Sequence, residues 1–323
     1  MNEPSKGVSW LHRFAALIAV LGFFLVVFGT PAVQSRGHWQ APAANAMRLP
    51  ANGTPAIHRG AHSALLNDPR NAAPSPLKSP GGPDRAAYKW SVLSVGALTL
   101  ILALWLSRAK SRGYIKGFGW LAVLGIAGLA LLDGNGVLAG HPAAATVAQG
   151  VAAETFFCLA VCLALFTRTD WHWGGSGVAD LKQPSFRALS VVVAAVLFAE
   201  PVLADFFSAG SFRMAPHLVV GMVLFACVLW MLEMVFNEFP TVAGLKIPTV
   251  LLAELVGLAF FVGLIAYGIE LEARRTTGRH PGLVIISATH AALGTLALAA
   301  GLFVTFQAFK HLASLEESST IAK

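Results

Sequence analysis

The sequence predicts an all-α membrane protein whose eight transmembrane helices form two pseudo-symmetric four-helix bundles. Three observations lead to this fold class. Of 323 residues, 56% are hydrophobic and 12% are charged, whereas soluble domains carry about 25% charged residues. Apolar segments long enough to cross a bilayer, which takes about 20 residues, recur along the chain. These segments also fall into two sets of four, separated by a linker rich in Gly, Ser and Trp.

Each expected helix is an apolar run bounded by charged, Gly-rich or Pro-containing residues. The first run, Phe14 to Gly29, follows Lys6 and Arg13, so a signal peptide is an alternative to a membrane span there. The Ala-rich sequence that follows the run would suit cleavage, but a span is the interpretation adopted. The expected spans are 12–34, 87–107, 115–138, 142–167, 186–208, 213–236, 247–269 and 281–309.

The short loop between the second and third spans predicts the orientation. It runs from Arg108 to Lys116, with four positive charges and no acid. Short basic loops stay in the cytoplasm, so both chain ends are expected to be cytoplasmic. The N-terminal half, 1–168, then includes a long outer loop at 36–85, rich in Pro, Ala, Asn and Gly. Residues 169–185 form a cytoplasmic linker, and 186–323 form the C-terminal half.

Composition also argues against some function classes. The formal net charge is +7, but the basic residues fall in loops, and no basic helix interleaved with aromatic residues predicts a nucleic-acid partner. The three cysteines, Cys158, Cys162 and Cys227, lie within predicted helices and form no Cys-x-x-Cys motif. We therefore expect them to pack as small apolar residues rather than to bind metal.

Two histidines inside apolar helices of the C-terminal half are the strongest functional signal. With spans starting near 211 and 281, His217 and His290 lie about 9 Å and about 13 Å along their helices, at comparable depth. A polar side chain inside the membrane raises the free energy of the protein unless it binds a ligand or pairs with another polar group. Neutral imidazole is a strong axial ligand for haem iron. The pair therefore predicts a haem held inside a four-helix bundle. Hydrogen bonding to a neighbouring helix is the alternative.

Several other polar groups lie within the spans. Gln149 lies in the fourth span at a depth similar to that of His290 in the eighth. Glu154 follows Gln149 and is a candidate for a proton-handling or propionate-facing role. Glu254 lies deep in the seventh span, where a buried carboxyl is protonated or paired, either to relay protons or to pack helices. Glu200 is expected near an outer helix end, where exposure makes its charge inexpensive.

Six stretches together resemble the haem A synthase family of cytochrome oxidase assembly proteins. They are Trp10-Leu-His-Arg-Phe14, Leu98 to Trp105 with the basic loop and Gly119-Trp120, Asn135-Gly-Val-Leu-Ala-Gly140, Phe156-Phe-Cys-Leu159 and the helices of His217 and His290. The resemblance implies eight helices in two pseudo-equivalent bundles. It implies that His217 and His290 are the axial iron ligands of one haem b, and that the substrate haem O binds in the N-terminal half.

At the first-half ligand positions, the same alignment places Tyr88 and Gln149 where the family has histidines. Tyr88, Gln149 and Glu154 are therefore the candidate catalytic residues, and the chain is a divergent member that lacks the first histidine pair. The implied activity is oxidation of the haem O methyl group in haem A biosynthesis. The implied location is a bacterial-type inner (plasma) membrane, with a haem O synthase, terminal oxidase subunits or a second copy as partners.

Two alternatives stay open beside this enzyme. The chain could be a non-catalytic haem b-binding membrane subunit, for electron transfer or for oxidase assembly, as the intact second pair and the altered first pair suggest. It could also be a membrane subunit that uses the fold for protein contacts alone.

Overall fold

Long α-helices make up almost all of the described structure, a computed structural model. The structure describes residues 6–37, 83–134, 142–168, 171, 178–180, 183–209, 215–276 and 281–313. Eight helices in these ranges are long and apolar enough to cross a membrane, which confirms the predicted all-α class and the eight candidate spans. The helices are α1 (Lys6–Gly37), α3 (Pro83–Arg108), α4 (Gly113–Gly134), α5 (Pro142–Phe166), α6 (Phe186–Ala209), α7 (Ala215–Glu238), α8 (Ala243–Thr276) and α9 (Pro281–His311).

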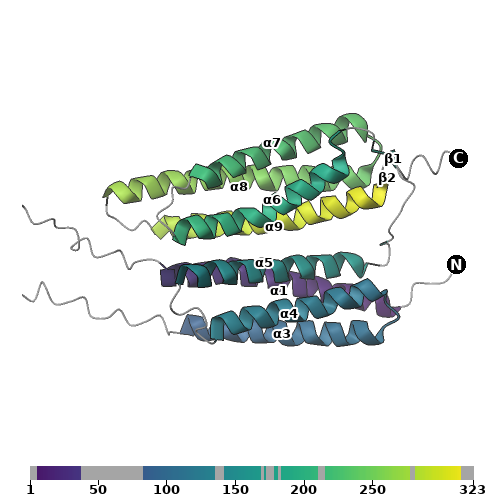
Figure 1. Cartoon of the computed structure of the whole chain (residues 1–323), viewed down its shortest axis with the longest axis horizontal. Helices are drawn as coiled ribbons and strands as arrows, with labels where there is room; N and C mark the ends of the chain where they lie inside the picture. The colour runs from purple at the N-terminus through teal and green to yellow at the C-terminus, as the bar shows by residue number, and fades with distance from the viewer. Residues whose placement is uncertain are drawn as a thin grey trace, which may run out of the picture.

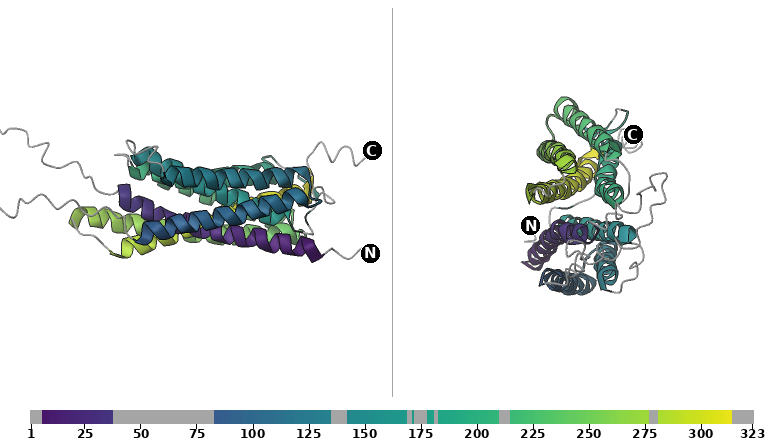
Figure 2. Two further views of the ribbon diagram at one scale, coloured as in Figure 1. Left: turned by 90° about the horizontal axis from the view of Figure 1, so that it is seen from below. Right: turned by 90° about the vertical axis from the view of Figure 1, so that its left-hand side faces the viewer.

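The helices pack as two groups of four, as Figure 1 shows. Within each group, every helix contacts the helices next to it in the ring α1–α3–α4–α5 or α6–α7–α8–α9. Each group also surrounds its own hydrophobic core. The view along the helices in Figure 2 shows the two groups side by side. We call them the N-terminal bundle and the C-terminal bundle.

The two bundles meet along α1 and α5 on one side and α6 and α9 on the other. An aromatic cluster fills one end of this interface: the rings of Phe166 on α5 and Phe306 on α9 are 4.9 Å apart between centroids. Trp171, which follows α5, packs on both rings. The Lys310 ammonium lies 5.8 Å from the centre of the Trp171 ring. These edge-to-face contacts add to the area that the bundles bury against each other.

The linker between the bundles is tied to the end of α9 by a short parallel pairing. Strand β1 (Val178–Ala179) pairs with β2 (Leu312–Ala313). The next residue, Asp180, is only 2% exposed. Its two carboxylate oxygens accept hydrogen bonds from the backbone N–H groups of Phe186 and Arg187, at 3.1 and 3.0 Å. Asp180 thus satisfies two donors at the start of α6, which the helix itself leaves without partners.

Several element boundaries differ from the predictions. Helix α1 continues to Gly37 and α3 begins at Pro83, so helices occupy both ends of the predicted 36–85 loop. The remainder of that loop, 38–82, lies outside the described residues. Helix α8 extends from Ala243 to Thr276, well beyond the predicted 247–269. Hydropathy locates only the apolar part of a helix. The helix itself can extend beyond that part, where caps and packing stabilise its polar ends.

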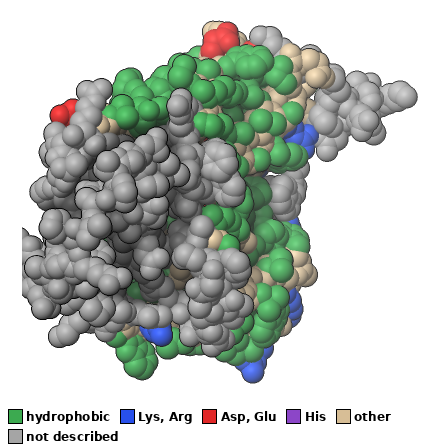
Figure 3. Space-filling view, turned by 60° about the vertical axis from the view of Figure 1, so that its left-hand side comes forward, with side chains coloured by type: hydrophobic (Ala, Val, Ile, Leu, Met, Phe, Trp, Pro, Cys, Tyr) green, Lys and Arg blue, Asp and Glu red, His purple; other side chains and the backbone are tan. Residues whose placement is uncertain are grey.

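The outer faces of the helices carry many large apolar side chains. Trp90, Leu124, Val219 and Ile247 are among the most exposed, at 59–73% of their surface. Figure 3 shows one such face, on which the described side chains are mainly hydrophobic and the visible charged groups lie toward the margins. A soluble protein rarely exposes so large an apolar surface. Lipid covers such a surface in a multi-pass membrane protein.

The contacts of Asp180 give the first testable prediction. Replacing Asp180 with Ala removes both cap acceptors in a buried place, so the free energy of unfolding should fall by about 1–2 kcal/mol. The measurement is the thermal unfolding midpoint of the full chain in detergent. Ser185→Ala is a matched control, because it removes a single cap bond that is more exposed, from the Ala188 N–H to the Ser185 hydroxyl. This change should lower the free energy of unfolding by less than Asp180→Ala does. Equal midpoints for Asp180→Ala and the wild type would contradict the assigned role.

Candidate functional site

The structure brings His217 and His290 together inside the C-terminal bundle. His217 lies on α7 and His290 on α9, two helices that occupy opposite corners of the four-helix ring. The centroids of the two imidazole rings are 6.1 Å apart, and the ring planes are nearly perpendicular, at 83°. His217 is buried and His290 is half-buried. The sequence singled out both residues as candidate iron ligands, and the structure places their rings close together.

The Nδ1 atom of each histidine lies close to an oxygen atom of a different neighbouring helix. Nδ1 of His290 is 2.9 Å from the backbone carbonyl oxygen of Ala259 on α8. Because a carbonyl only accepts, this nitrogen carries the proton and donates. Nδ1 of His217 is 2.9 Å from Oε1 of Glu200 on α6. Among the described residues this nitrogen has no partner with hydrogen-bond geometry, so the contact is a close approach of the two side chains. An imidazole whose Nδ1 donates a hydrogen bond, as that of His290 does, leaves Nε2 available to a metal.

Glu200 is the site residue that the sequence reasoning missed. Its predicted place at an exposed helix end is wrong, because its side chain is only 17% exposed and faces His217. Glu200 lies well inside α6, which continues to Ala209 and contains Pro201. A carboxyl inside an apolar helix, one residue before a proline, is a signal that could have identified it. The carboxylate oxygen lies directly beside the imidazole ring, at 2.9 Å from Nδ1.

Two glycines shape the space around His290. A Cβ atom on Gly263 of α8 would lie 2.8 Å from Cε1 of His290, so only glycine lets the ring approach α8 and reach the Ala259 carbonyl. A Cβ atom on Gly294, one turn after His290, would meet no heavy atom within 4 Å. Gly294 therefore borders open space. At Gly221 a Cβ would make ordinary van der Waals contacts, with Phe260 at 3.7 Å and with Oε1 of Glu200 at 3.8 Å.

His217 lies closer to its helix start than predicted. Helix α7 begins at Ala215, which places His217 about 3 Å along the axis at 1.5 Å per residue. His290 lies nine residues into α9, about 13 Å along, as expected. The two rings still meet because α9 begins further out than α7. The two imidazoles thus lie at the same depth in the bundle although their helices begin at different depths.

The N-terminal candidates are buried in the other bundle. Tyr88 lies on α3 and Gln149 on α5, which are opposite corners of the N-terminal ring. Gln149 is 6% exposed, and its side-chain nitrogen has no hydrogen-bond partner within the described part of the chain. Glu154, on the same helix, is 5% exposed. The structure thus places polar groups inside both bundles, but imidazoles only in the C-terminal pair of positions.

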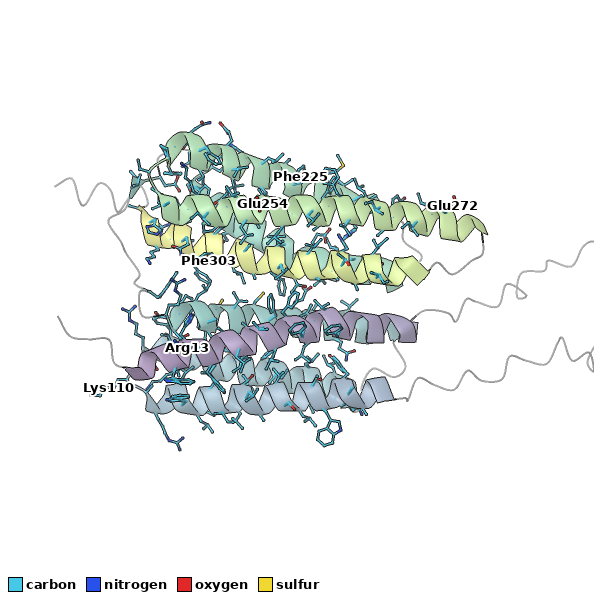
Figure 4. The ribbon with its side chains drawn as sticks, turned by 180° about the vertical axis from the view of Figure 1, so that it is seen from behind. Arg13, Lys110, Phe225, Glu254, Glu272 and Phe303 are labelled. Atoms are coloured by element: carbon cyan, nitrogen blue, oxygen red, sulfur yellow. The ribbon has the colours of Figure 1, made fainter. Side chains whose placement is uncertain are left out.

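Glu254 does not belong to either set. The expectation that this carboxyl is buried is wrong, because Glu254 is exposed on the outer side of α8. Figure 4 labels it on α8, well away from both ends of the helix. Helix α8 contacts α7 and α9 with its inner faces. The period of the helix turns position 254 away from them.

The arrangement suits iron in a macrocycle better than a bare metal ion. No group of three or more His, Cys, Asp or Glu side chains within the described ranges could hold a metal ion, and protein sites for zinc use three or four such ligands. Two imidazoles suffice for a haem, because the porphyrin supplies the other four donors. Comparison with known proteins finds no matching family model, no matching curated protein and no matching solved structure.

The close approach at Gly263 gives the second prediction. Gly263→Ala forces His290 away from α8 and breaks its bond to Ala259, so the free energy of unfolding should fall by about 1–3 kcal/mol. Gly268→Ala on the same helix meets no heavy atom within 4 Å and should be neutral or stabilising. Thermal unfolding of both full-length variants in detergent measures the difference. Equal stability of the two variants would show that the contact does not constrain His290.

Proposed function

We propose that this chain is a membrane haem protein that binds one haem b between His217 and His290. The observation that carries the proposal is the spacing of the two imidazoles. Metal–imidazole bonds are about 2 Å long, and each ring centre lies about 1 Å beyond its nitrogen, so two opposed ligands on one iron have centres about 6 Å apart. The rings here are 6.1 Å apart.

The chain's own residues define how the haem would be held. His217 and His290 would supply the nitrogens that bind the iron, while the Ala259 carbonyl fixes the ring of His290 and Glu200 lies beside the ring of His217. Bound haem iron would supply one-electron redox chemistry. The sequence contains no Cys-x-x-Cys-His attachment motif, which supports a non-covalent, b-type haem.

The arrangement of the helices supports an internal duplication, as in the haem A synthase family. Both bundles have the same ring order, with the second and fourth helices at opposite corners. In the C-terminal bundle these two helices carry His217 and His290. In the N-terminal bundle they carry Tyr88 and Gln149. We infer that the bundles are pseudo-symmetric, that Tyr88 and Gln149 occupy the equivalent positions, and that the chain is a divergent member of the family.

The activity that follows is oxidation of the haem O methyl group, with haem O bound in the N-terminal bundle. Support comes from the buried side-chain nitrogen of Gln149, which has no partner among the described residues. A buried donor without an acceptor is costly, and an oxygen of a bound ligand would satisfy it. A non-catalytic haem b subunit is the second candidate. The observation that favours it is the absence of imidazole at these two positions.

The charge distribution supports an orientation with both chain ends in the cytoplasm. The first turns of α1, the end of α9 and the basic loop between α3 and α4 lie at one end of the molecule (Figures 1 and 4). Arg13 and Lys110 are labelled at that end. Short basic loops stay on the cytoplasmic side. The histidine pair then lies toward the outer side of a bacterial-type inner membrane.

Loss of either ligand should remove the haem. The wild-type chain in lipid nanodiscs should show one low-spin haem per chain, extracted as haem b. His217→Ala and His290→Ala should each lose most of it, because one imidazole leaves iron with a single protein ligand. His311→Ala, at the far end of α9, is the control and should keep the haem. Full haem content in both ligand variants, or none in the wild type, would contradict the proposal.

The catalytic part has a separate test. Coexpression with a haem O source should yield hydroxylated haem O or haem A, detected by mass spectrometry of extracted haems. Gln149→Leu should lower the product by about five- to a hundredfold if the amide holds the substrate, since a lost buried hydrogen bond costs about 1–3 kcal/mol. Gln307→Leu, a buried glutamine on α9, is the matched control. Haem b without any oxidised product in the wild type would favour the non-catalytic subunit.

A further inference from the structure

A groove lies on the outer face of α3, next to the end of this helix. It has a volume of about 360 Å³ and is lined by Ile101, Leu104, Trp105 and Arg108. All four side chains are exposed. They are three or four residues apart, so they form one stripe along the helix, about 10 Å long at 1.5 Å per residue. Because the apolar span ends at Arg108, the groove is apolar along its length and cationic where α3 leaves the membrane.

The guanidinium of Arg108 is available to a ligand. Within the described ranges, no hydrogen bond or ion pair engages it. A basic side chain in the last turn of a helix often covers the last backbone carbonyl groups, but here other groups beyond the helix end already donate to them. These carbonyl groups belong to Trp105, Leu106 and Ser107. The Arg108 side chain is therefore not needed to complete the end of its own helix.

The charges around the groove favour a ligand with a net negative charge. Arg13 of α1 and Lys110, two residues after α3, lie at this same end of the N-terminal bundle (Figure 4). The acids of the described helices of this bundle lie at its other end or in its interior; they are Asp84, Asp133 and Glu154. A phosphate accepts paired hydrogen bonds from one guanidinium. A zwitterionic headgroup would also bring an ammonium, which the nearby cations repel.

We propose that this groove binds one anionic phospholipid, and we call it the α3 lipid site. The headgroup phosphate accepts hydrogen bonds from Arg108, and one acyl chain lies along Ile101 and Leu104. Trp105 forms a wall of the site, and its ring packs on Phe14 of α1 with 6.3 Å between the ring centroids. Tryptophan is enriched at the level of lipid headgroups, and basic pockets on membrane helices bind anionic headgroups.

A phospholipid fits this groove better than the other occupants do. Ordinary bilayer lipid fills the apolar part, but with no preference for the charge of the headgroup. A free phosphate engages Arg108 and leaves the apolar part uncovered. An anionic phospholipid joins both chemistries in one molecule. The site depends neither on haem nor on the orientation of the chain, because α3 ends at a membrane surface in either orientation.

The charge part is tested by native mass spectrometry of the full chain in detergent, titrated with phosphatidylglycerol or with phosphatidylethanolamine carrying the same acyl chains. The wild type should bind one phosphatidylglycerol in preference to phosphatidylethanolamine. Arg108→Gln should weaken the binding of phosphatidylglycerol by about fivefold, the attraction of one basic side chain for an anionic lipid surface. Arg112→Gln is the matched control, because it removes the same charge from the exposed basic loop outside the groove, and should weaken binding far less.

The groove part has its own pair of variants. Leu104→Trp fills the groove and should weaken the binding of phosphatidylglycerol, whereas Leu93→Trp, at an exposed position of the same helix outside the groove, should not. Glycerol phosphate, the headgroup without acyl chains, should not displace the lipid, and displacement would identify a free-anion site instead. Thermal unfolding confirms that each variant is folded.

Three further results would overturn the proposal. The first is equal affinity of the wild type for the two phospholipids. The second is an equal loss of affinity in Arg108→Gln and Arg112→Gln, which would show a diffuse attraction to the basic end rather than a site. The third is unchanged binding of phosphatidylglycerol in Leu104→Trp, which would show that no acyl chain lies in the groove.

Discussion

The inability of lipid to form hydrogen bonds is the constraint on which this structure depends. It leaves the helix as the way for each span to satisfy its own backbone, and it decides where polar side chains go. Almost all the large side chains on the outer faces are apolar. The histidines, Gln149 and Glu154 point into the bundles instead, where other helices can contact them. The same buried polar side chains therefore affect both how the helices pack and what the protein can bind.

The histidine pair shows how strongly that constraint couples the helices. His217 comes from α7 and His290 from α9, and their Nδ1 atoms lie 2.9 Å from Oε1 of Glu200 on α6 and from the Ala259 carbonyl oxygen on α8. All four helices of the C-terminal bundle therefore contribute to the surroundings of the two rings. Gly263 adds a steric requirement, because the ring of His290 occupies the volume that any Cβ atom there would take.

Sequence reasoning recovered what depends on composition and spacing, and it missed what depends on helix rotation. The eight spans follow from hydropathy, and the histidine pair follows from the cost of imidazole in lipid. The direction of a side chain around the helix is set by neighbours that a single sequence does not reveal. Hence Glu200 was expected at an exposed helix end but faces His217, and Glu254 was expected inside but faces outward. The cap at Asp180 was missed because its partners lie beyond an irregular linker.

The difference between the bundles bears on what each could do with a haem. Two imidazoles bind iron firmly, which suits a resident cofactor that stays through many turnovers. Tyrosine can bind haem iron, as in catalase, but a carboxamide such as that of Gln149 is a poor ligand, so a haem in the N-terminal bundle would be held mainly by packing and by hydrogen bonds. A substrate haem must leave after reaction, and weak ligation lowers the barrier to its departure. Under the proposed function, the C-terminal bundle would retain its haem and the N-terminal bundle would exchange one, and the residues Tyr88, Gln149, His217 and His290 would account for the difference.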